Sequence, residues 1–222
     1  MDWTALALSL RLGALTVLVL LPVGIGLARA LAYGRFRGKS FAEAALALPL
    51  VLPPTVVGYY LLVAFGGASP LGQAYAAMFG HGLVFTFEGL LLASVIVNLP
   101  FAVQPMQRAF EAIAPEIREA AAVSGMTRWR VFALIDLPLA WPGIVTGLVL
   151  AFAHTLGEFG VVLMVGGSIT GETKTVAIAI YDRVQAFDNV AAGMMSATLL
   201  VLSLAALALT YVLSSRVGRR HA

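Results

Sequence analysis

Five apolar stretches, each about 20 residues long or longer, constrain this sequence more than any other feature. A helix that crosses the hydrocarbon core of a bilayer needs about 20 mainly apolar residues. Only 11% of the 222 residues are charged and 60% are hydrophobic, whereas a soluble domain carries about 25% charged residues. The stretches predict an all-α, polytopic membrane helix bundle with about five transmembrane helices, at 12–31, 44–65, 89–109, 139–165 and 190–213.

Basic residues are concentrated in alternate connecting segments. The segments 29–40 and 108–136 and the tail after 213 contain eleven (4 + 4 + 3), and the segments 66–82 and 166–189 contain two. The remaining one, Arg11, lies at the start of the first stretch. Lysine and arginine accumulate on the cytoplasmic side of membrane proteins. The pattern therefore predicts a multi-pass membrane protein with the N-terminus outside and the C-terminus inside.

Two stretches resemble a phosphate-binding loop without matching it. Gly34 and Gly38 are separated by three residues instead of four, and Glu172 stands where the second near-match needs a lysine. There is no cysteine, and the three histidines have no metal-ligand spacing. We expect this chain to bind no metal and no cofactor, and not to hydrolyse ATP by itself.

The segment 111–138 is predicted to contain a short helix of its own. Pro115 suits a first helical position, and Gly125 suits the residue just after a helix. One face of this helix is predicted to carry Ile117, Ala120, Ala121 and Ser124. Small side chains let another surface approach closely, and short isolated helices are marginal in water. We therefore expect the helix to pack against a partner protein or lipid headgroups.

The same segment resembles the cytoplasmic motif of ATP-binding-cassette importer permeases: Glu119-Ala120-Ala121, then Gly125, then Ile135, Leu137 and Pro138. The resemblance implies one permease domain over residues 1–222 in the plasma membrane (bacterial inner membrane), with 111–138 as the coupling segment that docks on an ATPase. ATP and Mg would then be bound by that separate subunit, and this chain would not be an enzyme. The implied partners are a second copy of the chain, two ATPase subunits, an external oxyanion-binding protein and membrane lipid, with no nucleic acid.

Three further segments are similar to the molybdate-type branch of that family. They are "ALPLVLPPTVVGYYLL" (47–62), "VNLPFAVQPM" (97–106) and "LGEFGVVLMVGGSITGETKTVAIAIYD" (156–182). The similarity implies import of an oxyanion, molybdate in the first place, with tungstate or sulfate as alternatives. Ser168-Ile169-Thr170 departs from the Asn-Ile-Pro that is common in the family, which affects only the detail of an outer loop.

Prolines and polar residues inside the predicted spans are candidates for the pathway or its gate. Proline removes a helix hydrogen bond, and ionisable groups in a membrane are costly. The candidates are Pro53, Pro54, Thr55, Asn98, Pro100 and Glu158. The alternatives are a static kink for the prolines, and for Glu158 a buried partner of His154 or of a backbone N–H. Because the inner spans lack lysine and arginine, we expect a weakly binding conduit whose cargo is recognised by the binding protein.

Another class of function remains open, namely a stand-alone secondary transporter or channel. Such a protein is expected to carry a midplane ion-coupling pair or an inverted repeat. The sequence shows neither of these features. An intramembrane enzyme would need a catalytic pair, for which only His154 and Glu158 are available.

Overall fold

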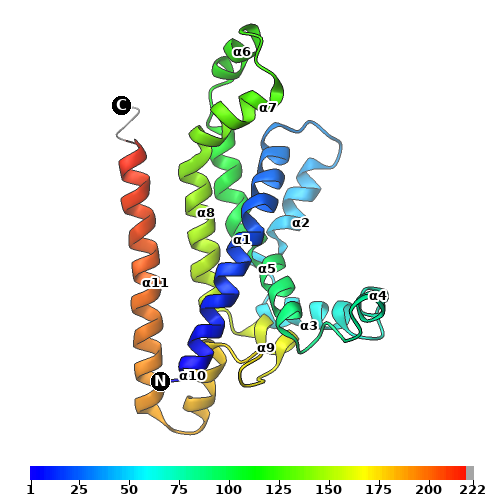
Figure 1. Ribbon diagram of the computed structural model, residues 1–222, viewed down its shortest axis with the longest axis vertical. Helices are drawn as coiled ribbons and strands as arrows, with labels where there is room; N and C mark the ends of the chain where they lie inside the picture. Colours follow the sequence, from blue (N-terminus) through cyan, green and yellow to red (C-terminus); the bar gives the residue numbers. More distant parts are fainter. Residues whose placement is uncertain (219–222) are drawn as a thin grey trace.

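Four long helices lie side by side and form the body of the molecule (Figure 1). They are α1 (Trp3–Tyr33), α5 (Phe87–Glu111), α8 (Leu137–Gly157) and α11 (Asn189–Gly218). The computed structural model describes residues 1–218, and side chains as far as residue 208. Within these residues, four helices are long and apolar enough to cross a membrane, or five if one sharply bent pair counts as a span. The predicted helical membrane bundle is therefore confirmed.

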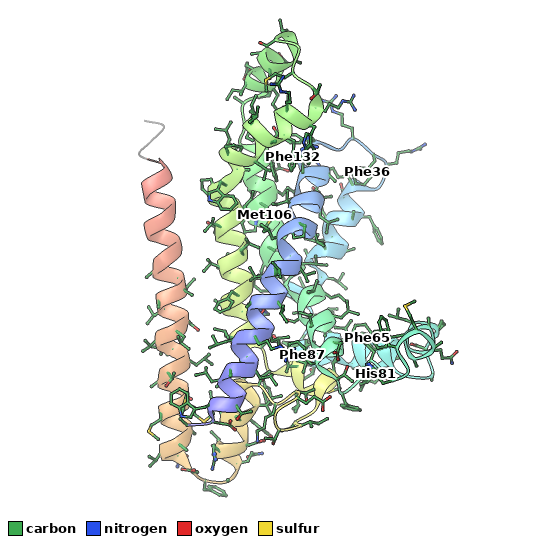
Figure 2. The ribbon with its side chains drawn as sticks, in the orientation of Figure 1. Phe36, Phe65, His81, Phe87, Met106 and Phe132 are labelled. Carbon is green, nitrogen blue, oxygen red and sulfur yellow. The ribbon has the colours of Figure 1, made fainter. Side chains whose placement is uncertain are left out.

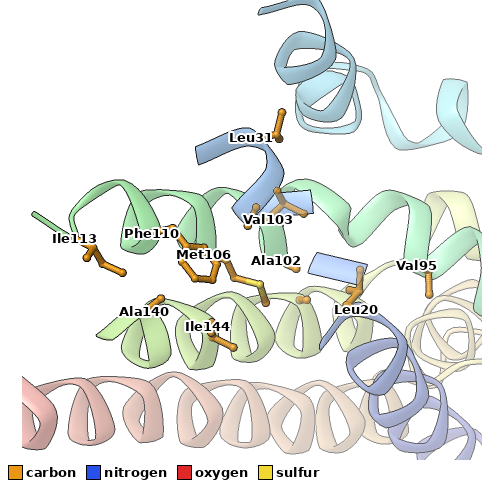
Figure 3. Close-up of a cluster of buried hydrophobic side chains, with 12 residues drawn as sticks. Leu20, Leu31, Val95, Ala102, Val103, Met106, Phe110, Ile113, Ala140 and Ile144 are labelled. Carbon is orange, nitrogen blue, oxygen red and sulfur yellow. The ribbon is translucent and has the colours of Figure 1, made fainter. Parts of the chain in front are cut away.

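The core lies where α1, α5 and α8 meet. Leu20, Met106 and Ile144, one from each helix, are fully buried there together with their neighbours (Figure 3). Gly147 brings α8 against α5, since a Cβ at this position would lie 2.5 Å from the backbone oxygen of Ala102. Small residues at such contacts are typical of membrane helices, whose association depends on close packing.

The predicted span 44–65 is divided into two helices by a sharp bend at its prolines. Helix α2 (Lys39–Val51) ends before Pro53, and α3 (Pro54–Phe65) continues at an angle of 113° to it. Proline disfavours helical backbone in the residue before it, and Pro53 and Pro54 follow one another. Helix α3 and the following α4 (Pro70–Phe79) project sideways from the long helices (Figure 1).

The predicted span 139–165 also differs from the structure at both ends. Helix α8 stops at Gly157, and after a break a separate helix α9 (Gly160–Gly166) packs against α3. At its other end, α8 follows directly on α7 (Arg128–Val131) and the π-turn η1 (Phe132–Asp136), and the three together make a helix of 30 residues.

The two ends of the bundle differ in charge. One end, called the basic end below, carries the α1–α2 turn, α6 (Pro115–Val123), α7 and the C-terminal part of α11 (Figure 1). The N-terminus and α10 (Val176–Gln185) lie at the opposite end; in Figure 2, Phe132 lies toward the basic end and Phe87 toward the opposite one. The structure thus gathers the segments predicted to be cytoplasmic at one end, although Arg219 and Arg220 lie outside the described residues. That this end faces the cytoplasm stays a prediction.

Candidate functional site

The predicted short helix is α6, at the tip of the basic end. Pro115 occupies its first turn as expected, and Glu119 and Ala120 are exposed to solvent. Ala121 is only 5% exposed and faces the rest of the protein, so the predicted contact face is divided between a free side and a packed side. The free side, which includes Ile117 at 42% exposure, is open to a partner.

Gly125 has a backbone role in this segment. Its φ of +75° lies in the left-handed region, which glycine adopts without steric cost. Its N–H donates to the carbonyl of Ala122 and the N–H of Met126 donates to that of Ala121, which together form a Schellman cap. A Cβ at this position would meet nothing within 4 Å. The glycine is thus required to end α6 rather than to make room for a neighbour.

The last part of the motif, Ile135 to Pro138, forms the junction of η1 with α8. The N–H of Leu137 donates to the carbonyl of Phe132, five residues back, which closes the π-turn. Pro138 has no N–H to give to the carbonyl four residues earlier, so the ordinary α-helical ladder is interrupted here. π-turns of this kind re-aim side chains and are frequent at functional sites. Here Pro138 is exposed, whereas Asp136 points into the protein.

Asp136 is the centre of a buried ion cluster that our reasoning from the sequence missed. Its side chain is completely buried, and it accepts hydrogen bonds from Arg29 Nε at 3.2 Å and from Arg29 Nη2 at 3.1 Å. On the other side, its Oδ1 lies 3.2 Å from Arg118 Nε. This ion cluster (Arg29, Arg118 and Asp136) therefore joins α1, α6 and the start of α8.

Tyr33 strengthens the same junction. The guanidinium of Arg118 lies over the Tyr33 ring, 3.7 Å from its centroid, and the Tyr33 hydroxyl donates to the carbonyl of Phe110 at 2.9 Å. Cation–π contacts of this kind contribute about 0.5–2 kcal/mol. The coupling segment is consequently fixed to α1 as well as to its own helix α8, and Tyr33 in turn joins α1 to the end of α5.

A chain of buried polar side chains crosses the bundle nearer the opposite end. Asn98, fully buried in α5, donates to the carbonyl of Ser94 at 2.8 Å and to Thr155 Oγ1 at 3.1 Å. Thr16 of α1 donates to Ser94 Oγ at 3.1 Å. His154 Nδ1 lies 3.1 Å from Asn98 Oδ1. Asn98 thus has partners on both its amide atoms, and this polar chain links α1, α5 and α8.

Glu158 stands at the break between α8 and α9. Its Oε1 accepts a hydrogen bond from the N–H of Val161 at 2.9 Å, and its Oε2 lies 3.7 Å from His154 Nε2. A carboxylate at this place satisfies a free N–H of the first turn of α9 and is favoured by the helix dipole. Glu158 therefore has both of the partners that were expected as alternatives, a backbone N–H and His154. A gating role for Glu158 stays a prediction.

The other candidates are distributed over two places. Pro53, Pro54 and Thr55 form the bend between α2 and α3, where the carbonyl of Pro53 accepts from the N–H groups of the next turn. Pro100 is buried within α5, two residues beyond Asn98. The structure therefore separates the candidates into a coupling group at the basic end and a polar group near the breaks in the helices.

The second near-match to a phosphate loop is a packed part of the fold. Lys174 forms an ion pair with Asp182 of α10 at 2.6 Å, and Thr173 is fully buried. The N–H of Val176 donates to Ser9 Oγ in α1 at 2.8 Å. These contacts anchor the segment to α1 and α10, which gives it a structural role.

A family model described as "Binding-protein-dependent transport system inner membrane component" matches residues 21–219. The chain belongs to this family. Among curated relatives, the molybdenum transport system permease protein ModB of Azotobacter vinelandii is 48% identical over 206 residues, covering 90% of this chain and 91% of the relative. The protein of that name in Escherichia coli K12 is 42% identical, over 83% of this chain and 80% of the relative.

A sulfate transport system permease protein, CysT of E. coli K12, is 36% identical over 84% of this chain and 67% of the relative. Two solved structures share the fold. A bacterial alginate ABC transporter in complex with its pentasaccharide-bound periplasmic protein gives a TM-score of 0.71, at 20% identity, over 98% of this chain and 78% of the other. An amino acid ABC transporter gives 0.66, at 19% identity, over 97% and 93%. The chain is thus a multi-pass membrane permease with the fold of ABC transporter subunits.

Proposed function

We propose that this permease imports molybdate as a homodimer that works with two copies of a separate ATPase and an external binding protein. The observation that carries the substrate assignment is the 48% identity to a molybdenum permease over 90% of the chain, against 36% to a sulfate permease. Tungstate has the same charge and nearly the same size as molybdate, so it is expected to compete.

The ATPase docks on α6 in this proposal. Glu119 and Ala120 lie on the free side of the helix and contact the partner directly, and Ala121 packs behind them. Gly125 gives α6 its end, and the Ile135–Pro138 turn connects it to α8. ATP and Mg are held by the partner, so this chain contributes mechanical coupling and no chemistry.

The substrate passes through a conduit that binds it weakly. A tight site for a doubly charged oxyanion needs arginine, lysine or several convergent N–H donors. The described parts of α5 and α8 offer Asn98, Thr155 and His154 instead, and these already bond to one another. Weak contacts allow the anion to leave, while the binding protein supplies recognition.

Alternating access follows from moving α6. When the two ATPases close on ATP, they displace the α6 helices, and the ion cluster transmits this movement to α1 and α8. The inner and outer parts of the pathway change their relative position at two places, which are the bend at Pro53 and Pro54 and the break at Glu158. Hydrolysis resets the cavity to face the cytoplasm.

Reconstituted vesicles test this proposal directly. Vesicles with this chain, its ATPase and its binding protein are expected to accumulate radioactive molybdate only with ATP. Excess tungstate should compete strongly and excess sulfate weakly. Ala120→Glu should abolish ATPase binding and uptake, whereas Ile180→Val, a conservative change in α10 far from α6, should affect neither. Uphill uptake by this chain alone, without nucleotide, would instead establish a secondary transporter.

A further inference from the structure

Two adjoining pockets lie between α1 and the start of the α7–α8 helix, and they share two arginines. The first, of about 500 Å³, is mainly apolar and is lined by Ile25, Gly26, Ala30, Trp129 and Phe132 with Arg29 and Arg128 at its side. The second, of about 330 Å³, is lined by the same two arginines together with Arg118, Ala122, Met126 and Val131. One continuous surface thus offers an apolar part and a cationic part.

The cationic part carries an uncompensated charge. Of its three arginines, Arg29 and Arg118 share the single carboxylate of Asp136. Arg128 is exposed and has no ion-pair partner among the described residues. Three positive charges against one negative charge leave +2, and neither pocket lining contains a carboxylate. The second pocket therefore favours an anion.

The residues of α1 that line the apolar pocket lie at the level of the edge of the membrane. Ile25 and Ala30 lie eight and three residues before the end of α1 at Tyr33, or about 12 and 5 Å at 1.5 Å per residue. This interval matches the boundary between acyl chains and headgroups at the basic end. Trp129 is 72% exposed, and the centroid of its ring lies 5.3 Å from that of Phe132. Tryptophan is enriched at this boundary.

We propose that this surface is a binding site for an anionic phospholipid. Its phosphate lies among Arg29, Arg118 and Arg128, and one acyl chain lies along the apolar pocket beside Trp129. Basic pockets between membrane helices recognise anionic headgroups by the same combination of charge and apolar contact. Because Arg29 and Arg118 also belong to the ion cluster, the bound lipid stabilises the junction between the coupling segment and α1. The inference does not depend on which oxyanion is transported.

Quenching of Trp129 fluorescence by brominated lipid tests the site. Trp3 and Trp141 are exposed, so Trp3→Phe and Trp141→Phe leave Trp129 as the only tryptophan in the full chain. The protein is reconstituted into mixed phosphatidylcholine and phosphatidylglycerol vesicles in which only one lipid carries bromine, at matched mole fractions. Brominated phosphatidylglycerol is expected to quench more strongly than brominated phosphatidylcholine.

A neighbouring arginine provides the matched control. Arg128→Gln should lower the relative affinity for phosphatidylglycerol about fivefold, since one basic residue near an anionic surface contributes about that factor. Arg130→Gln removes the same charge two residues away, outside both linings, and should leave the preference unchanged. Equal quenching by both lipids, or loss of the preference in the Arg130 variant alone, would overturn the site.

Two further measurements distinguish a bound lipid from other occupants of this surface. Inorganic phosphate at constant ionic strength should not reduce the preference, and if it does, the site binds free phosphate rather than lipid. Addition of the partner ATPase should also leave the quenching in place. Loss of quenching on that addition would show that the ATPase covers the pocket and would reject the lipid assignment.

Discussion

Replacing Asp136 by asparagine removes the one carboxylate that joins Arg29 to Arg118. Asparagine has nearly the same volume, so the substitution changes charge without opening a cavity. The side chain at 136 is completely buried, and about 30% of each arginine is exposed, at 32% and 29%. In the variant, two guanidinium groups face each other across a buried amide. The attachment of the coupling segment to α1 is expected to weaken.

The size of the effect follows from the burial of the cluster. Removing one partner of a buried ion pair costs about 3–5 kcal/mol, because the remaining charge stays buried without compensation. Water reaches part of both arginines and screens their repulsion, so we expect the lower end, about 3 kcal/mol. At about 1.4 kcal/mol per factor of ten, local opening of the segment should become about 100 times more frequent.

Limited trypsin digestion measures this opening. Trypsin cuts after arginine, and Arg128 and Arg130 lie within the segment that the cluster holds in place. When opening is fast relative to cleavage, the digestion rate follows the open population. Cleavage at these two sites should therefore be about 100 times faster in Asp136→Asn. Glu116→Gln, at an exposed carboxylate of α6, serves as the control and should be cut at the original rate.

A triple variant distinguishes an ion cluster from general damage to the fold. Arg29→Met, Arg118→Met and Asp136→Leu together remove all three charges, and such replacements are often neutral or stabilising. Cleavage at the two remaining arginines should return close to the original rate. If Asp136→Asn alone were digested at the original rate, the cluster would not be what holds the segment to α1.

Three other outcomes are expected. Gly147→Ala places a Cβ 2.5 Å from a backbone oxygen of α5 and should destabilise the protein by about 1–3 kcal/mol, which thermal unfolding in detergent detects. Gly193→Ala, in a helix where a Cβ meets nothing within 4 Å, is the control and should not lower the midpoint. Reporter fusions after Gly72 and after Ala222 should lie outside and inside respectively, and the reverse pattern would overturn the membrane orientation. Spin labels on cysteines introduced at exposed positions of α3 and α8, in a chain that has none of its own, should change their separation when the assembled transporter binds ATP; two labels on α8 should not.

Local signals in the sequence predict the helices and the ends of α6. Apolar length alone is enough to place four of the spans, because a lipid environment leaves few alternatives to a helix. The short helix was predictable from Pro115 and Gly125, which act on their own backbone and its nearest neighbours. These features need no knowledge of how the helices pack.

The ion cluster was not predictable in the same way, since Arg29 and Asp136 are 107 residues apart in the sequence. Their meeting depends on the packing of α1 against α8 and on the π-turn that aims Asp136 inward. One signal was available: Asp136 is the only acidic residue between Glu119 and Glu158, within a largely apolar run. Asp136 occupies the one position between Ile135 and Leu137 at which the motif specifies no residue. The resemblance therefore pointed to those two residues and not to Asp136.

The two breaks in the helices determine where a movement that the ion cluster transmits from α6 would occur. Helices α1, α5 and α8 pack around one cluster of buried side chains and are joined to α6, so a force on α6 acts on them together. Helices α3 and α9 pack against each other in a second cluster, beyond the bend at Pro53 and the break at Glu158, and α5 contributes Ala93 and Val97 to it. A helix transmits force along its hydrogen-bonded axis. The connection of α2 to α3 and that of α8 to α9 interrupt such an axis, whereas α5 is continuous and packs in both clusters. Movement driven from α6 is therefore expected at these two joints, beside the polar side chains of α5 and α8, where the two groups change their relative position.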